Sequence, residues 1–221
     1  MIRAAIQRGL GLGLLSALLG CNSPSHGPTQ PPRLGSAAGP EAPAGYPGTL
    51  RDPAQMGPDI QWQQRVTARW QDDTQSFEAV LSKTDHELLL VGLSPMKTPG
   101  FIVRLTNGEV ELENRSPQEV PFDPRYIMLD IQRVYFPWIP GEPPVDAERS
   151  HRVDGEQVTE RWAQGQLRQR RFVREDGRPP GEITVTYEGW EDGQDAPRRA
   201  VLDNGWFGYT LEIETFVQQR L

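Results

Sequence analysis

The sequence has very few of the residues that carry enzymatic or metal chemistry. It contains one cysteine, Cys21, and three histidines, so an intrachain disulfide is excluded. His86 and His151 lack the spacing of a metal-binding pair, and no glycine-rich phosphate-binding loop is present. The segment GLSP at residues 92–95 lacks the second glycine of a nucleophile elbow. We therefore expect neither an enzyme nor a protein that holds a cofactor or a metal ion.

An excess of positive charge is also missing. The formal net charge is −7, and it becomes −9 without residues 1–20, which hold Arg3 and Arg8. Domains that bind nucleic acids are usually basic. A nucleic acid is therefore not an expected partner.

Long apolar runs are confined to the N-terminus. Two arginines precede the run GLGLGLLSALLG in residues 1–20, which is typical of a signal peptide and too short for a membrane-spanning helix. The run ends at Cys21 in LLGC, which resembles the bacterial lipobox. The resemblance implies that Cys21 is acylated, and Asn22 after it implies the outer membrane of a Gram-negative bacterium, facing the periplasm. Each buried methylene of such an anchor contributes about 0.8 kcal/mol.

A segment without apolar periodicity follows the cysteine. Residues 22–59 contain nine prolines and six glycines. Such a composition cannot bury enough apolar surface to offset the entropy of ordering it. We expect a lipidated, flexible tether at residues 21–58 and one monomeric folded domain at residues 59–221.

Most of the remaining chain alternates polar and apolar residues. In IQWQQRVTARW (60–70), Trp62, Val66 and Trp70 share one face of a predicted strand. Asn107–Gly108 and Asn204–Gly205 are typical of tight hairpin turns. The pattern predicts a mainly β fold in which about eleven antiparallel strands curl into an open barrel.

The segment DPRYIMLDIQRVYFPW at residues 123–138 breaks this alternation and predicts a helix. Asp123 suits the N-cap and Pro124 the first helical position. One apolar stripe runs along the predicted helix, formed by Ile127, Ile131, Val134, Tyr135 and Trp138. The side expected to face water holds Asp130, Gln132 and Arg133. We expect this helix to cover or plug the concave side of the barrel.

The run LLLVGLSPMKTPGFIVRL at residues 88–105, followed by residues 123–138, resembles an uncharacterised group of bacterial lipoproteins related to LolB. LolB is the outer-membrane acceptor that takes lipoproteins from the periplasmic carrier LolA. The resemblance covers most of residues 60–216 and implies an open antiparallel barrel around an apolar cavity, with a helical lid. It also places Met96 on a protruding loop that contacts the membrane. The chain departs from the pattern in having Met96 where leucine is more usual, and in having one clear lid helix.

Two functions remain open from the sequence. The first is a lipoprotein that binds acyl chains, lipid or lipoprotein cargo in an apolar cavity and hands it to the membrane, with a LolA-like carrier as a partner. The second is a binding or assembly module that docks a periplasmic protein without transport. Acyl chains gain about 25 cal/mol per Å² of apolar surface removed from water, so the first needs only a dry, well-shaped cavity.

The candidate cavity and lid residues are the inward apolar positions of the strands and helix. They are Trp62, Val66, Trp70, Phe77, Val103, Leu105, Ile127, Ile131, Val134, Tyr135, Trp138, Tyr209 and Leu211. The alternative is that these side chains pack against one another and leave no cavity. Four basic residues on one predicted strand are either a solvated face or a contact for lipid headgroups or an acidic partner: Arg168, Arg170, Arg171 and Arg174.

Overall fold

The computed structural model describes residues 45–117 and 123–221. The predicted signal peptide, Cys21 and residues 22–44 of the predicted tether lie outside the described residues. The described elements are a short 3-10 helix η1 (Pro53–Gln55), one α-helix and eleven strands. The strands are β1 (Ile60–Trp70), β2 (Asp73–Lys83), β3 (Leu88–Leu93), β4 (Pro99–Thr106), β5 (Glu109–Asn114), β6 (Ala147–Val153), β7 (Glu156–Ala163), β8 (Gln166–Arg174), β9 (Glu182–Glu188), β10 (Arg199–Asn204) and β11 (Tyr209–Arg220).

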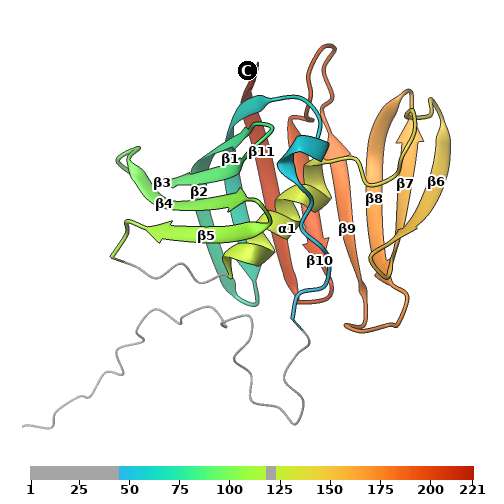
Figure 1. Ribbon diagram of the computed structural model, residues 1–221, viewed down its shortest axis with the longest axis horizontal. Coiled ribbons are helices and arrows are strands. Elements are labelled where there is room, and N and C mark those ends of the chain that lie inside the picture. Colours follow the sequence, from blue (N-terminus) through green and yellow to red (C-terminus); the bar gives the residue numbers. More distant parts are fainter. Residues whose placement is uncertain (1–44, 118–122) are drawn as a thin grey trace, which may run out of the picture.

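All eleven strands belong to one antiparallel sheet. Its order is β5-β4-β3-β2-β1-β11-β10-β9-β8-β7-β6, so the first and last strands of the chain meet in the middle. The edge strands β5 and β6 stand at opposite ends, and the curled sheet stays open (Figure 1). This confirms the predicted open antiparallel sheet of about eleven strands.

The two predicted hairpin turns differ in length. Between β4 and β5, Asn107 and Gly108 both take positive φ angles, 53° and 81°, as a tight Asn-Gly turn requires. Between β10 and β11, the connection continues to Gly208, which takes a φ of 70°. The first turn is therefore the two-residue type expected from the sequence, and the second is longer.

The helix α1 (Pro124–Tyr135) begins as predicted and ends earlier. The Asp123 carboxylate accepts a hydrogen bond from the Arg125 amide at 2.8 Å, and Pro124 occupies the first helical position. Phe136 then takes an extended conformation, as expected for a residue before proline. Trp138 thus lies beyond the helix, and its indole N–H donates to the Gln132 carbonyl at 2.9 Å.

The helix lies in the concavity of the sheet and separates two apolar clusters (Figure 1). One cluster fills the space toward β7–β11 and includes Phe172, Ile183 and Leu202. The other lies toward β1–β4 and includes Leu81 and Leu105. Residues of α1 contribute to both clusters, so the helix is part of the core and not a cap laid over it.

The prediction that Asp130, Gln132 and Arg133 face water is wrong. Their exposed fractions are 5%, 0% and 0%. The reason is the segment 45–56, which crosses this side of the helix and buries it (Figure 1). Gln132 exchanges hydrogen bonds with the backbone of Arg51, at 2.8 and 3.0 Å. Residues 45–58, included in the predicted tether, are therefore packed on the domain.

Candidate functional site

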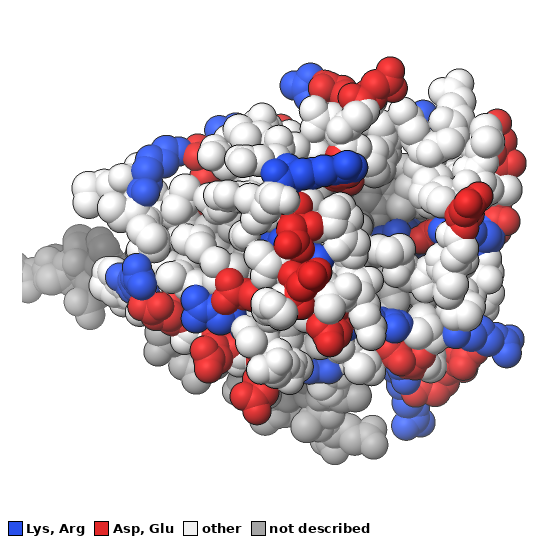
Figure 2. All heavy atoms as spheres, turned by 45° about the horizontal axis from the view of Figure 1, so that its top comes forward, with Lys and Arg blue, Asp and Glu red and all other residues white. Residues whose placement is uncertain are grey.

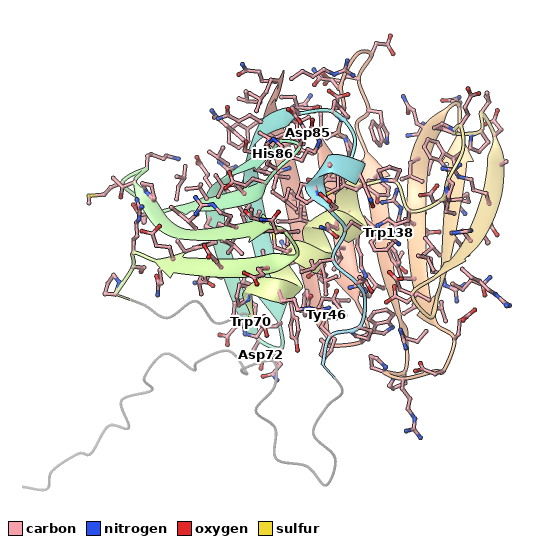
Figure 3. All side chains as sticks on the ribbon, viewed as in Figure 1. Tyr46, Trp70, Asp72, Asp85, His86 and Trp138 are labelled. Carbon is pink, nitrogen blue, oxygen red and sulfur yellow. The ribbon has the colours of Figure 1, made fainter. Side chains whose placement is uncertain are left out.

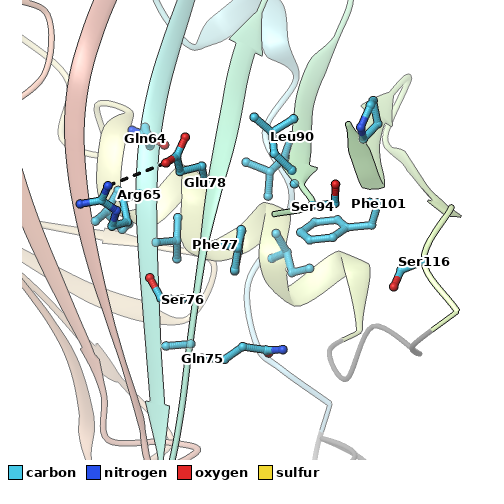
Figure 4. Close-up of a pocket in the computed structure, with 18 of the residues that line it drawn as sticks. Gln64, Arg65, Gln75, Ser76, Phe77, Glu78, Leu90, Ser94, Phe101 and Ser116 are labelled. Atoms are coloured by element: carbon cyan, nitrogen blue, oxygen red, sulfur yellow. Dashed lines mark ion pairs between the residues drawn. The ribbon is translucent and has the colours of Figure 1, made fainter. Parts of the chain in front are cut away.

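An apolar cavity of about 720 Å³ lies between α1 and the β1–β4 side of the sheet (Figure 4). Its walls come from β1, β2, β3, β4 and β11, from α1, and from the β3–β4 loop. This volume falls within the range of about 300–1,000 Å³ that is typical of small-molecule sites. The inward side chains therefore leave open space on this side of the helix.

The structure divides the predicted cavity residues into two groups. Seven of them line the cavity: Val66, Phe77, Ile127, Ile131, Tyr135, Tyr209 and Leu211. The other six are absent from its walls and lie packed in the buried core: Trp62, Trp70, Val103, Leu105, Val134 and Trp138. Strand alternation, and the apolar stripe of the predicted helix, assigned both groups to the inward side. Their position along the strands relative to α1 decides which side chains meet open space.

Several lining residues escaped the sequence analysis. Leu90 belongs to a continuous apolar run, in which alternation cannot show the inward face. Phe101 follows the loop that carries Met96, and Gln64 and Asp130 were passed over because they are polar. Register provides the missing signal, since Leu90 pairs with Leu81, which faces inward.

Phe101 lies against Phe77 at the wall of the cavity, with ring centroids 5.5 Å apart in an edge-to-face arrangement (Figure 4). Gly92, its partner across β3 and β4, makes room for this ring. A Cβ atom at Gly92 would lie 2.1 Å from Cε1 of Phe101, a distance that forces the ring to move. The absence of a side chain at Gly92 thus sets the position of an aromatic wall residue.

Gly92→Ala is expected to lower the free energy of unfolding by about 1–3 kcal/mol, because Phe101 must leave its contact with Phe77. Urea denaturation of the Cys21→Ser chain measures this. Gly100→Ala is the matched control, since a Cβ there meets its nearest atom at an ordinary 3.6 Å. Equal stability of the two variants would contradict this account of Gly92.

Asp130 places a carboxylate against the inner wall of the cavity. Its two oxygens accept hydrogen bonds from the hydroxyls of Tyr46 and Tyr209. Burial raises the pKa of this carboxyl to about 6, although both hydroxyls and the Arg133 guanidinium lower it. A second polar contact lies nearby, where the Gln64 amide donates to the Tyr135 hydroxyl at 2.7 Å. These polar groups form hydrogen bonds with one another, so each of them has a partner although the space beside them is apolar.

The mouth of the cavity has a different character. Met96 on the β3–β4 loop is 82% exposed. Lys97 beside it pairs with Glu78 on β2, and Arg65 on β1 approaches the same carboxylate at 3.7 Å (Figure 4). Charges therefore collect at the rim, next to one large exposed apolar side chain.

The four arginines of β8 do not form one exposed basic stripe. The predicted headgroup contact is wrong for Arg170, which is 3% exposed and pairs with Glu160 at 2.8 Å. Its guanidinium also donates to the Arg133 carbonyl at the end of α1, at 2.8 Å, because this strand position faces inward. Arg171 and Arg174 pair with Glu182 and Asp176, and Arg168 is half-buried. Figure 2 shows acidic and basic side chains interspersed over the face in view.

A model of the DUF3261 family, described as a protein of unknown function, matches residues 61–217. The chain belongs to this family. The match includes α1, nine whole strands and most of β1 and β11, so the DUF3261 domain and the folded sheet nearly coincide. No curated protein matches the chain.

The DUF3261 chain is similar to several solved structures, but only distantly, as two of them illustrate. A LolA superfamily protein from Nitrosomonas europaea is 10% identical over 77% of this chain and 90% of its own, with a TM-score of 0.45. The lipoprotein LppX from Mycobacterium tuberculosis is 13% identical over 71% of this chain and 84% of its own, with a TM-score of 0.29. At such values the likeness is too distant to assign a ligand.

Two kinds of feature are absent from the described part of the DUF3261 chain. Within residues 45–117 and 123–221, no helix combines the length and the apolar character needed to cross a membrane. In the same residues, no group of three or more histidine, cysteine, aspartate or glutamate side chains is placed to hold a metal ion.

Proposed function

We propose that this DUF3261 protein binds the acyl chains of a lipid or of a lipidated protein in the cavity between α1 and the sheet. The observation that supports this is an open cavity of about 720 Å³ whose inner walls are apolar. Of the described charged residues that line it, Asp130 is buried, Glu78 at the rim is half-buried, and the others are exposed at the rim: Arg65, Lys97 and Arg115. An acyl chain entering such a space gains about 25 cal/mol per Å² of apolar surface removed from water.

The proposed role is binding and transfer, without bond-making. The C-terminal end of α1 is held by Arg170, Tyr187 and Trp138, whose side chains donate to its last carbonyls at 2.7–2.9 Å. Cargo would therefore enter and leave past the β3–β4 loop, with the helix staying in place. Met96 and Lys97 at that loop suit an apolar membrane with charged headgroups.

The proposed setting follows from the N-terminus. Acylation of Cys21 would hold the protein on the outer membrane, with the domain in the periplasm and a LolA-like carrier as the donor of cargo. Radiolabelled palmitate in the wild-type chain, and none in Cys21→Ser, would support the anchor.

Leu211→Glu tests the cavity, because it places a carboxylate on an apolar wall. We expect binding of a dansyl-labelled fatty acid, followed by fluorescence, to weaken by about tenfold or more, since a buried unpaired charge is costly. Phe216→Glu is the matched control on the same strand, where the side chain is 53% exposed and outside the cavity lining. A wild-type chain that binds no probe, or equal binding by both variants, would overturn the proposal.

A further inference from the structure

The segment from Tyr46 to Arg51 forms a strap across α1, visible as the blue trace in Figure 1. Two side chains of the helix hold its first half: Arg125 donates to the Tyr46 and Gly48 carbonyls at 3.0 and 2.6 Å, and Arg133 donates to the Pro47 carbonyl at 2.8 Å. Gln132 holds its second half through the backbone of Arg51. The strap therefore depends on helix side chains along its whole length.

Tyr46 is the strap residue whose side chain enters the interior of the domain, and Figure 3 labels it beside α1. Its ring is 2% exposed and packs edge-on against Tyr126 and Phe207, with centroids 4.9 and 5.1 Å away. Its hydroxyl donates to the Asp130 carboxylate and accepts from the Asn204 amide at 2.8 Å. One hydroxyl thus joins the strap, α1 and β10.

The same carboxylate faces the cavity. Asp130 and Tyr209 are both lining residues, and Tyr209 supplies the hydrogen bond to the second carboxylate oxygen. An apolar ligand that covers Asp130 removes its remaining contact with water. The carboxylate then depends more strongly on the two tyrosine hydroxyls, because a buried acceptor without a donor is unfavourable.

We propose that Tyr46 is a positioning residue that couples ligand binding in the cavity to the attachment of the strap to α1. A ligand that covers Asp130 strengthens the hydrogen bond between this carboxylate and Tyr46. By reciprocity, the attached strap strengthens ligand binding. This inference rests on the proposed function, since it requires a ligand in the cavity.

The test uses the full chain with Cys21→Ser and monopalmitoylglycerol, an uncharged single-chain lipid. Hydrogen exchange followed by mass spectrometry reports on the strap amides, including Arg51, whose N–H is bonded to Gln132 at 2.8 Å. In the wild-type chain, we expect saturating lipid to slow exchange of the strap several-fold. In Tyr46→Phe, which keeps the ring and removes the hydroxyl, this slowing should vanish and the lipid should bind about tenfold more weakly.

Tyr135→Phe is the matched control. It removes a hydroxyl from a residue of α1 that lines the cavity, but the partner of this hydroxyl is Gln64 and not the strap. Lipid should still slow strap exchange in this variant. Lipid binding without any change in strap exchange in the wild type would overturn the coupling alone. Failure of the wild type to bind the lipid would overturn the proposed function and the coupling together.

Discussion

Replacing Arg133 by methionine is expected to lower the free energy of unfolding by about 3–5 kcal/mol. The guanidinium is completely buried and donates to the Glu156 carboxylate at 3.0 Å. Its carbon lies 4.6 and 5.0 Å from the ring centroids of Tyr46 and Trp206. Removing it leaves Glu156, itself 1% exposed, as a buried charge whose other cationic neighbour, Arg174, is 4.0 Å away.

Urea denaturation of the Cys21→Ser chain measures this loss, and the surface offers a control. Arg171 pairs with Glu182 at 2.6 Å, but the two side chains are 49% and 42% exposed. Because exposed ion pairs contribute about 0–1 kcal/mol, Arg171→Met should change stability little. The double variant Arg133→Met with Glu156→Gln should recover part of the loss, since no unpaired charge remains. Equal losses in Arg133→Met and Arg171→Met would show that the buried pair is not a main support of the fold.

The second large effect is a dependence of stability on pH that originates at Asp130. Burial raises the pKa of this carboxyl in the folded protein to about 6, from the ordinary 3.8. Because the folded state holds its proton more tightly, folding takes up a proton between these two values. The stabilisation is fully present below about pH 4 and is lost as the pH rises through about 6, up to about 3 kcal/mol in total.

Asp130→Asn should therefore flatten the plot of unfolding free energy against pH between about 4 and 7. A shallower slope should remain, because burial also raises the pKa of Glu156. Asp176→Asn is the control, since its hydrogen bond with Arg174 lowers the Asp176 pKa to about 2 and confines its titration to more acidic solutions. An unchanged slope in Asp130→Asn would mean that this carboxyl titrates normally in the folded protein.

Both predictions concern side chains of α1 that were expected from the sequence to face water and that are buried in the structure. Of the predicted stripe, Ile127, Ile131 and Tyr135 line the cavity, whereas Val134 is packed in the core. The polar residues of α1 are buried as well, because the segment 45–51 covers Gln132 and Arg133, and Asp130 lies between the cavity and Tyr46. The polar residues there bond to partners far away in the chain, such as Tyr46, which is 84 positions from Asp130. A periodicity of 3.6 residues carries no information about such partners.

The local features of this protein could be predicted from its sequence. Alternation fixed the strands, Asn107–Gly108 fixed a hairpin, and Asp123–Pro124 fixed the start of α1, because each depends on neighbours a few residues away. Which inward residues are packed in the core and which line a cavity depends instead on how distant parts of the chain pack together. Trp62 and Val66 share one face of β1, yet the first is packed in the core and the second meets open space. The pairing of β1 with β11 and the position of α1 make that difference, and both are set by contacts between distant parts of the chain.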